Sequence, residues 1–476
     1  MSKLARENAA PGSSGGDACA NPQQALVDFV TGAAFDALPP ALVERCKRHI
    51  LDTLGAALAG ATSQVAQDMT RLLEMEEAAP QSPVWGTGLA TSARNAALLN
   101  GIAAHALELD DTGGCDHSGA VVIPALLAIL PLCPRPVSGR ELICATVIGY
   151  DVARRVLEAC GGYSAHNGAG WHSTATCGVF GAAAAAARLL GLGTAQVSSA
   201  LGVAGSFSGG LWGFIHDGSQ SKKLHAGRAA EGGVLAALCA MRGITGPGAL
   251  FDDRWGGFLA TFAAGSAVPE ALTERLGRVW KLERCSIKPY ASCRGTHAAI
   301  DAAGLLLGRL GAGGDEIAAI EVRLCPFLND MCGNTHIQTL AAAQMSLPYA
   351  VAARLVFGHA GLDAYGELQR RDPRLLAMMA RITLLVDPAL SADGEPEITL
   401  LTRDGDRLSL RVEVALGNPA NPVSDRQLRD KFLSLAARAL PVTQAQALWA
   451  RGMALEGEDD ISALVPLLIP NQRDFI

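Results

Sequence analysis

The stretch His105-Ala-Leu-Glu-Leu-Asp-Asp-Thr-Gly-Gly-Cys-Asp-His-Ser-Gly-Ala-Val-Val-Ile-Pro124 places an acidic turn between two apolar segments. The apolar pattern predicts a helix from Ser92 to Leu107 and a second helix after His117. The turn carries three carboxyl groups, those of Glu108, Asp110 and Asp111. Such crowding at the negative end of a helix dipole is destabilising unless cations or protons compensate it. The stretch therefore indicates a functional site, with a solvated acidic turn as the alternative.

The length and composition of the chain limit its class. The 476 residues suffice for two domains with a substantial core. Hydrophobic residues make up 49% and charged residues 18%, which is typical of a folded and not of a disordered protein. The net charge of -7 argues against nucleic acid as a partner, because binding phosphates requires a basic surface. An anionic substrate would have to meet a local concentration of Lys, Arg and His.

The cysteines and the apolar segments indicate a cytoplasmic protein that does not bind membranes. The 12 cysteines include no Cys-x-x-Cys pair, so we expect reduced thiols and no iron–sulfur cluster. Residues 1–22 lack the apolar core of a signal peptide and are expected to form a disordered tail. The most apolar segment, Ala120 to Cys133, is too short to cross a bilayer and contains prolines, so it predicts a buried helix.

Apolar residues at helical spacing dominate the first half of the chain and predict an all-helical domain over residues 23–268. The predicted helices include Gln24–Ala34, Pro40–Ala61, Ser138–Cys160, Phe180–Leu190, Thr194–Gly205 and Arg228–Arg242. Ser138 and Glu141 form a capping-box pattern at the start of one of them. The unbroken alanines from Ala182 to Ala187 allow neighbouring helices to approach closely.

The pattern changes after Pro269, and residues 269–420 are predicted to form an α+β domain with an antiparallel sheet. Strand patterns occur at Ile317–Leu324, Arg381–Val386, Glu397–Leu401 and Leu408–Val414, with helices at Gly295–Leu310 and Leu340–Phe357. Asp404-Gly405 is a hairpin signal between the last two strands. Residues 421–476 return to a helical pattern and are expected to pack on the first domain. The predicted fold class is mainly α, with a discontinuous large helical domain and a smaller α+β domain.

Two groups of basic residues in the first domain are candidates for binding or proton transfer. His172 follows a Gly-Trp pair at the start of an Ala-rich helix, where a histidine has a reduced affinity for protons. Lys222, Lys223 and His225 lie in a predicted short loop, and a lysine beside other cations can become a general base. A core histidine and a solvated basic loop are the respective alternatives.

A third cluster lies in the second domain, in Lys288-Pro-Tyr-Ala-Ser-Cys-Arg-Gly-Thr-His297. Here Arg294, followed by a helix-opening Thr-His pair, offers a guanidinium fork and helix-end donors to a carboxylate. The alternative is a cluster of interface salt bridges. No metal site is predicted, because the histidines lie at no ligand spacing, and no Gly-rich phosphate loop follows a strand. The histidines considered are His105, His117, His172, His225 and His297.

Together these segments resemble the MmgE/PrpD family, which includes 2-methylcitrate dehydratases, cis-aconitate decarboxylases and iminodisuccinate epimerases. The resemblance covers almost all of the chain from Gln23 onwards. The motifs that carry it are Ile50-Leu-Asp-Thr-Leu-Gly55, Asn100-Gly-Ile-Ala-Ala-His105, Asp110-Asp-Thr112 with His117, Gly170-Trp-His172, Lys222 with His225, Lys288-Pro-Tyr290 through His297, and Ser346-Leu-Pro-Tyr349. It implies the same two domains, a homodimer, and a site between the domains that uses no metal and no organic cofactor.

The resemblance also implies which residues form the site. The active-site residues that it carries over are Thr112, His117, His172, Lys222 and Lys288. The family usually has Asp two residues before the Asp-Asp pair, whereas this chain has Glu108, whose longer side chain moves the carboxyl group outward by a methylene group. Arg294 follows Ser-Cys as in dehydratase-like bacterial members, a position where decarboxylase and epimerase members differ.

We expect a lyase that forms or protonates a carbanion-like centre beside a carboxylate of a small di- or tricarboxylic acid. The predicted catalytic residues are Glu108, Asp111, Thr112, His117, His172 and Lys222, and the predicted substrate-binding residues are His225, Lys288, Tyr290 and Arg294. The first hypothesis is a hydro-lyase similar to 2-methylcitrate dehydratase, in which His117 assists the leaving hydroxyl group. A decarboxylase of aconitate-type acids is the second, an epimerase of an amino-diacid the third, and a carboxylate binder without activity the fourth.

Overall fold

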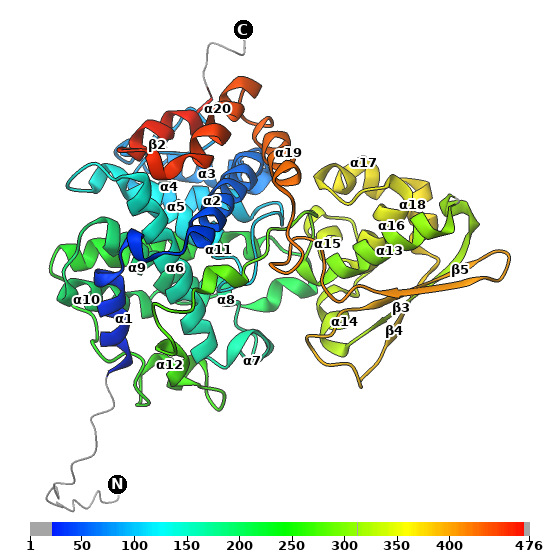
Figure 1. Cartoon of the computed structure of the whole chain (residues 1–476), viewed down its shortest axis with the longest axis horizontal. Helices are drawn as coiled ribbons and strands as arrows, with labels where there is room; N and C mark the ends of the chain where they lie inside the picture. Colours follow the sequence, from blue (N-terminus) through cyan, green and yellow to red (C-terminus); the bar gives the residue numbers. More distant parts are fainter. Residues whose placement is uncertain (1–20, 312, 471–476) are drawn as a thin grey trace, which may run out of the picture.

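Two lobes of unequal size make up the chain, and the computed structural model describes residues 21–311 and 313–470. Figure 1 shows a large helical lobe, which holds the N-terminal half and the last helices, beside a smaller lobe of helices and a sheet. The predicted combination of a mainly α part and an α+β part is confirmed. Residues 1–20 of the predicted tail lie outside the described residues.

From residue 21 onwards, where the described part of the chain begins, twelve α-helices precede the smaller lobe. They are α1 (Pro22–Gly32), α2 (Pro40–Gly60), α3 (Gln64–Glu74), α4 (Ala93–His105), α5 (Gly119–Ile129), α6 (Gly139–Ala159), α7 (Gly162–Gly168), α8 (Ser173–Thr176), α9 (Gly178–Leu189), α10 (Thr194–Gly205), α11 (Ser221–Met241) and α12 (Phe258–Phe262). The hydroxyl groups of Ser63, Ser92 and Ser138 each accept a hydrogen bond from the N–H three residues later and so begin α3, α4 and α6. The two-residue strands β1 (Ser82–Pro83) and β2 (Ala90–Thr91) depart from the predicted all-helical lobe.

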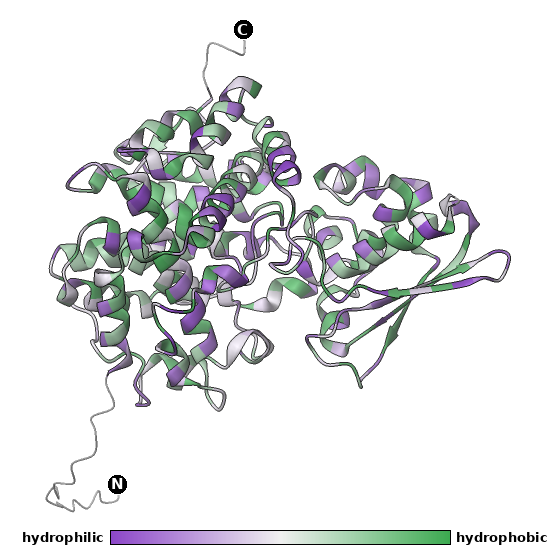
Figure 2. Cartoon of the chain, viewed as in Figure 1, coloured by the Kyte–Doolittle hydropathy of each residue, from purple (hydrophilic) through white to green (hydrophobic). Residues whose placement is uncertain are grey.

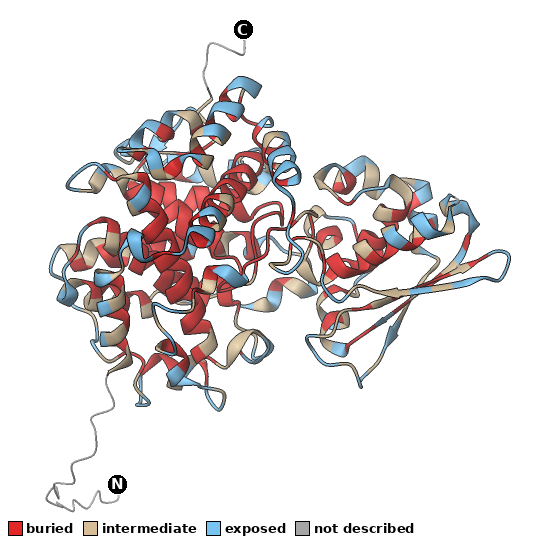
Figure 3. Ribbon diagram, viewed as in Figure 1, coloured by how far each residue is buried: buried red, intermediate tan, exposed pale blue. Residues whose placement is uncertain are grey.

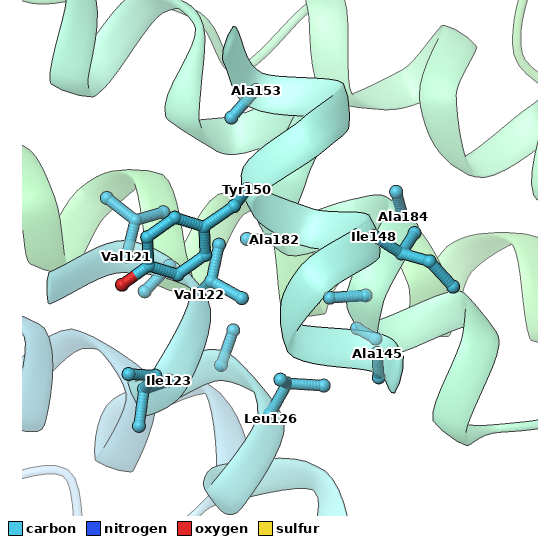
Figure 4. Close-up of a cluster of buried hydrophobic side chains, with 14 of the residues drawn as sticks. Val121, Val122, Ile123, Leu126, Ala145, Ile148, Tyr150, Ala153, Ala182 and Ala184 are labelled. Atoms are coloured by element: carbon cyan, nitrogen blue, oxygen red, sulfur yellow. The ribbon is translucent and has the colours of Figure 1, made fainter. Parts of the chain in front are cut away.

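The core of the helical lobe lies where α5, α6 and α9 meet. Figure 4 shows apolar side chains of these helices in one cluster, among them Val122, Ile148 and Ala184, all fully buried. Figures 2 and 3 show that the hydrophobic segments of the lobe coincide with its buried segments. Burial of apolar surface contributes about 25 cal/mol per Å² and is the main force that stabilises such a helical body.

A close contact between α4 and α11 brings two distant parts of the chain together. A Cβ atom at Gly101 would lie 2.7 Å from the Cα atom of Gly227. Because both positions are glycines, the two helix backbones can approach this closely. The contact sets the first turn of α11 beside the acidic turn that follows α4.

The smaller lobe packs helices against one face of a four-stranded sheet (Figure 1). Its elements are α13 (His297–Leu310), β3 (Ile317–Leu324), α14 (Pro326–Cys332), α15 (Leu340–Gln344), α16 (Leu347–Phe357), α17 (Glu367–Arg370), α18 (Pro373–Met379), β4 (Ile382–Val386), β5 (Glu397–Thr402) and β6 (Arg407–Arg411). The predicted helix Leu340–Phe357 is divided between α15 and α16, because Ser346 caps a new helix with Pro348 in its first turn.

The sheet is mixed, whereas the sequence predicted an antiparallel one. The strand order is β4-β3-β5-β6, and the pairs β3/β5 and β5/β6 are antiparallel, as predicted. The pair β3/β4 is parallel, because the chain between these strands runs through five helices and returns in the same direction. The hairpin between β5 and β6 turns at Gly405, whose φ of 93° is accessible to glycine.

The last two α-helices, α19 (Asp425–Ala436) and α20 (Val442–Met453), lie on the helical lobe. The ring of Phe432 packs against α2 at Gly55, where a Cβ atom would lie 3.1 Å from it. Lys431 donates a hydrogen bond to the carboxylate of Asp52 in α2 at 2.6 Å. The cysteines of the described residues are free thiols. Within the same part of the chain, no helix combines the length and the apolar character needed to cross a bilayer.

Candidate active site

The turn between α4 and α5 is held in place by Asp111. Its carboxylate accepts hydrogen bonds from the N–H of Gly119 at 2.9 Å and from the hydroxyl group of Tyr150 at 2.7 Å. It also lies 3.0 Å from Nδ1 of His49. These side chains are buried in the helical lobe. Asp111, predicted to move protons, is thus placed among core contacts and not along the cavity described below.

Glu108 meets three lysines that come from both lobes. Its Oε1 accepts hydrogen bonds from Nζ of Lys222 at 2.8 Å and from Nζ of Lys223 at 2.5 Å. Its Oε2 lies 3.6 Å from Nζ of Lys288. All four side chains are buried, and Glu108 has a φ of 54°, which residues with a side chain rarely adopt. The cations that the acidic turn requires are therefore present.

Lys222 and Lys223 lie in a helix and not in the predicted loop. Helix α11 begins at Ser221, seven residues before the predicted start at Arg228. Two cations at the N-terminus of a helix oppose its dipole, which favours a loop when only the sequence is known. The carboxylate of Glu108, close in space but distant in sequence, compensates them and permits the earlier start.

The charges of this cluster shift the pKa values of its members. Burial alone would raise the pKa of Glu108, but Lys222, Lys223 and Lys288 outweigh burial and hold this pKa well below its usual range. Burial opposes the charge of Lys222, but Glu108 raises its pKa above the ordinary value. Burial lowers the pKa of Lys223, and the attraction of Glu108 compensates only part of this effect. Lys222 is therefore a stable cation, and Lys223 gives up its proton more readily.

His117 lies between two carboxylates. Its Nδ1 donates to the carbonyl oxygen of Asp111 at 2.8 Å and lies 3.1 Å from Oδ2 of Asp110, while its Nε2 lies 3.3 Å from Oδ2 of Asp116. Asp116 is fixed in turn by the hydroxyl group of Thr112, which donates to it at 2.8 Å. Burial opposes protonation of His117, but Asp116 and Asp110 outweigh it and raise its pKa above the ordinary value.

The neighbouring imidazoles are neutral near pH 7. Burial lowers the pKa of His105 to about 4, although its Nδ1 lies 2.8 Å from the carboxylate of Asp110. Burial and the neighbouring His225 hold the pKa of His172 well below its usual range. Burial and Lys222 lower the pKa of His225 to about 4. The Nε2 atoms of His105 and His172 are buried without a hydrogen-bond partner among the described residues. Nδ1 of His105 donates to Asp110, so Nε2 of a neutral His105 is a hydrogen-bond acceptor.

Three imidazoles come close to one another although their sequence spacing predicted no metal site. One ring nitrogen from each of His105, His117 and His172 lies within 4.8 Å of the others. Zinc binds histidine nitrogens at about 2.0–2.1 Å, so these rings would have to move towards one another to share an ion. The raised pKa of His117 means that a proton competes with any metal at this position.

The smaller lobe contributes Lys288 through a short pairing of backbones. The N–H of Ser286 donates to the carbonyl oxygen of Thr112 at 2.7 Å, and the N–H of Thr112 donates back to Ser286 at 3.1 Å. This bridge holds the segment that enters the smaller lobe against the acidic turn. Nζ of Lys288 is buried and has no hydrogen-bond partner among the described residues, so it can donate to a bound anion.

Arg294 and Tyr290 already have protein partners. Nη2 of Arg294 lies 3.0 Å from Oε1 of Glu395, a residue of the loop between β4 and β5. Burial raises the pKa of Glu395, and Arg294 opposes this effect. The hydroxyl group of Tyr290 donates to Asp301 in α13, and Tyr290 does not line the cavity. Of these two predicted substrate contacts, the structure places only Arg294 at the cavity.

A cavity of about 720 Å³ lies between the two lobes. The predicted site residues that line it are Glu108, Thr112, His117, Lys222 and Arg294. Two further predicted residues lie behind this wall: the ring of His172 is 6.4 Å from that of His117, and Lys288 is in contact with Glu108. Segments that are far apart in the sequence thus bring cations, imidazoles and carboxylates to one cavity.

Three residues of this arrangement were not among the predicted site residues: His105, Asp110 and Asp116. All three lie in the stretch that was singled out from the sequence. Asp110 contacts both His105 and His117, and Asp116 contacts His117 from the other side. The sequence contained the signal, but adjacent acids such as Asp110 and Asp111 can be told apart only by the direction of their side chains.

The two-lobed fold thus brings buried lysine and histidine groups to a cavity between the lobes. Family models match the chain: the MmgE/PrpD N-terminal domain matches residues 24–270, and the MmgE/PrpD C-terminal domain matches residues 290–455. The chain belongs to the MmgE/PrpD family.

Individual relatives are similar over different shares of the chain. The cis-aconitate decarboxylase-like protein oryM of Aspergillus oryzae is 28% identical over 93% of this chain and 96% of its own length. The human cis-aconitate decarboxylase is 28% identical over 94% of each chain. A 2-methylcitrate dehydratase of Cupriavidus necator is 29% identical over 57% of this chain and 59% of its own length. These relatives are lyases, which supports an enzyme of the lyase kind.

Proposed function

We propose that this chain is a lyase for a small tricarboxylic acid and that its reaction is the decarboxylation of an aconitate-type substrate. The observation that carries the proposal is the contact of Glu108 with lysines from both lobes, beside a histidine with a raised pKa on the same cavity. The choice of decarboxylation over dehydration is supported by the decarboxylases, which match 93% or 94% of the chain, whereas the dehydratase matches 57%.

The lysines are placed to bind substrate carboxylates. Lys222 lines the cavity, and Nζ of Lys288 lies behind it without a hydrogen-bond partner among the described residues. A substrate carboxylate at this part of the cavity wall would accept charge-assisted hydrogen bonds from Lys222, and from Lys288 if the carboxylate of Glu108 shifts aside; such bonds are stronger than neutral ones, particularly where water is excluded. Glu108 raises the pKa of Lys222 and also contacts Nζ of Lys288, so it holds both lysines in place before the substrate arrives.

His117 is placed to donate the proton that completes the reaction. Loss of carbon dioxide leaves the electron pair of the broken C–C bond on the substrate, and this pair must take up one proton. The raised pKa keeps more of His117 protonated at neutral pH than of an ordinary histidine. Asp110 and Asp116 orient its ring, and the neutral ring of His172 lies 6.4 Å from it behind the cavity wall. We propose Asp111 as a positioning residue, since its contacts hold the turn.

Dehydration of a hydroxylated tricarboxylic acid, the first hypothesis from sequence, is the second candidate. The 2-methylcitrate dehydratase of Cupriavidus necator supports it, and so does Arg294 at the cavity wall, where it follows Ser-Cys. In this reaction the same protonated His117 would assist the departure of the hydroxyl group as water. The two reactions use one arrangement of side chains and differ in which bond of the substrate breaks.

A substrate panel in deuterated water separates the candidates. The protein is incubated with citrate, 2-methylcitrate, cis-aconitate, trans-aconitate and iminodisuccinate, and proton NMR follows each mixture. Decarboxylation of an aconitate, with release of carbon dioxide and uptake of one deuterium, is the expected result. Alkene formation from citrate or 2-methylcitrate would instead support a dehydratase. Deuterium exchange in iminodisuccinate would instead support an epimerase. Binding of these acids without any product would contradict the lyase.

Two variants test the assigned roles once the substrate is known. His117→Gln removes the proton donor, and Lys222→Met removes a carboxylate contact while keeping a similar volume. Loss of one acid–base group typically lowers the rate by about 10²- to 10⁴-fold, and we expect a decrease of this size for His117→Gln. His336→Gln, at an exposed histidine away from the cavity, is the matched control. Activity of His117→Gln near that of the control would contradict the role of His117.

A further inference from the structure

A second carboxylate with three cations lies at the rim of the cavity. Glu158, near the end of α6, accepts hydrogen bonds from Nε of Arg154 at 2.9 Å, Nη1 of Arg284 at 2.9 Å and Nζ of Lys281 at 2.5 Å. Lys281 and Arg284 belong to one 3-10 helix that runs from Lys281 to Arg284. Three positive charges thus share one negative charge, so this rim cluster (Arg154, Glu158, Lys281 and Arg284) has an excess of positive charge.

The excess charge faces the cavity. Arg154 and Arg284 line the cavity, whereas Lys281 does not. No hydrogen-bond partner for Nη2 of either arginine is found among the described residues. Two further cations of the wall are also paired with carboxylates: Arg294 with Glu395, and Lys222 with Glu108.

The positive charges of the rim cluster also repel one another, and a bound anion would reduce this repulsion. Burial and the nearby charge of Arg154 lower the pKa of Arg284 below its ordinary value, in spite of Glu158. Burial opposes the charge of Glu158, but hydrogen bonds from Lys281 and Arg154 outweigh it and lower the pKa of Glu158. The carboxylate is therefore already ionised and can supply no further negative charge. A bound anion would supply it, and the planar guanidinium groups match the geometry of a carboxylate.

The rim cluster is tied to the deeper part of the site. Nη1 of Arg154 donates to the carbonyl oxygen of Gly114 at 3.2 Å. Gly114 belongs to the same turn as Thr112 and His117, so Arg154 holds a fixed position relative to the proton donor. The cavity is therefore lined by two separate groups of cations, one at Lys222 and one at the rim cluster.

We propose that Arg154 and Arg284 form a second carboxylate subsite, which binds the end of the substrate that does not react and selects tricarboxylic over dicarboxylic acids. This subsite deepens the proposed function and rests on it for the nature of the substrate. The reacting carboxylate lies at the lysines, and the distal carboxylate lies between the two guanidinium groups.

Two saturated acids test the subsite without turnover. Tricarballylate carries three carboxylates, and methylsuccinate is the same skeleton without one terminal carboxylate. Their dissociation constants are measured by isothermal titration calorimetry at fixed ionic strength. We expect the protein to bind tricarballylate about 10- to 100-fold more tightly, since hydrogen bonds to charged groups have this effect on affinity. Equal affinity for the two acids, or no binding of tricarballylate, would overturn the subsite.

The variant Arg284→Gln tests whether the rim cluster causes the tighter binding of tricarballylate than of methylsuccinate. Its side chain is 49% exposed, so the variant should fold, which a thermal melt checks. We expect the ratio of the two dissociation constants to fall to near 1 in Arg284→Gln and to recover in part in Arg284→Lys. Arg135→Gln, at an exposed arginine paired with Glu141 away from this cavity, is the matched control and should keep the full ratio. An unchanged ratio in Arg284→Gln would overturn the proposal.

Different experimental results would contradict the subsite and the proposed function. A protein that shows the expected ratios but converts none of the panel acids keeps the subsite and is not a lyase for those acids. A protein that decarboxylates aconitate but keeps its ratio in Arg284→Gln is a lyase that binds the distal carboxylate elsewhere. If both hold, Arg284→Gln should raise the KM for the substrate more than it lowers kcat, because the contact is made equally before and during the reaction.

Discussion

Glu108 and Glu158 each have three cationic neighbours, yet they lie in different surroundings. Glu108 is 1% exposed and faces three buried lysines, whereas the side chain of Glu158 is 18% exposed and faces two arginines and one lysine. In the deep cluster, water cannot replace a lost partner, so each charge depends on the others. At the rim, Glu158 is partly exposed and Arg284 is half-exposed, so water and salt screen their charges. The comparison teaches that the same pattern of one carboxylate and three cations is more strongly interdependent where it is fully buried.

The largest expected effect comes from neutralising the two carboxylates in turn. Glu108→Gln should lower the free energy of unfolding by about 3–5 kcal/mol, because it leaves buried lysines without a partner. Glu158→Gln should lower it by only about 1 kcal/mol, because Glu158 is partly exposed and its partner Arg284 is half-exposed, so water can replace part of the lost interaction. Urea denaturation of the two variants and the unchanged protein measures both values. Equal losses in the two variants would show that the clusters do not differ in the way described.

Acid should destabilise the deep region first. The folded protein keeps His105 neutral down to a pKa of about 4, whereas the unfolded chain takes up this proton near the ordinary value of 6.5. A group with a lowered pKa stabilises the folded state above the unfolded value and loses this contribution as pH falls. Between pH 6.5 and pH 4 the loss from His105 should reach about 3 kcal/mol. The free energy of unfolding measured by urea denaturation across this range checks it.

The matched variants for this pH dependence are His105→Gln and His336→Gln. The slope of stability against pH between 6.5 and 4 should become flatter in His105→Gln, which has no proton to take up at this position. His336 is exposed, so His336→Gln should keep the slope of the unchanged protein. If His105→Gln keeps that slope as well, the acid sensitivity arises elsewhere.

The smallest expected effect is that of Lys281, the cation of the rim cluster that does not line the cavity. Lys281→Gln should lower the free energy of unfolding by about 1 kcal/mol or less, as is usual for an ion pair near the surface. The loss should shrink in 1 M salt, where the Debye length is about 3 Å. Thermal and urea unfolding at low and high salt measure it. A larger decrease in the free energy of unfolding, unchanged by salt, would show that the rim cluster behaves like the buried cluster around Glu108.

Much of the fold and part of the site could be predicted from local sequence. Helical periodicity and caps such as Ser138 with Glu141 specify helices, because their hydrogen bonds join residues that are near in sequence. The parallel pairing of β4 with β3 could not be predicted, because it depends on the path of the chain between them. The predicted loop at Lys222 was wrong for a related reason: the carboxylate that permits a helix there lies 114 residues away.

The sequence by itself determined the family, the mainly α and α+β layout, and the stretch around which the site forms. These properties follow from motifs and periodicities that a linear chain displays. Only the tertiary structure decided that Asp110 contacts His105 and His117 while Asp111 holds the turn. It also decided that the side chains of Arg154 and Arg284 share one carboxylate. The physical reason is that electrostatic interactions depend on distance and burial, and folding sets both for residues that are remote in sequence.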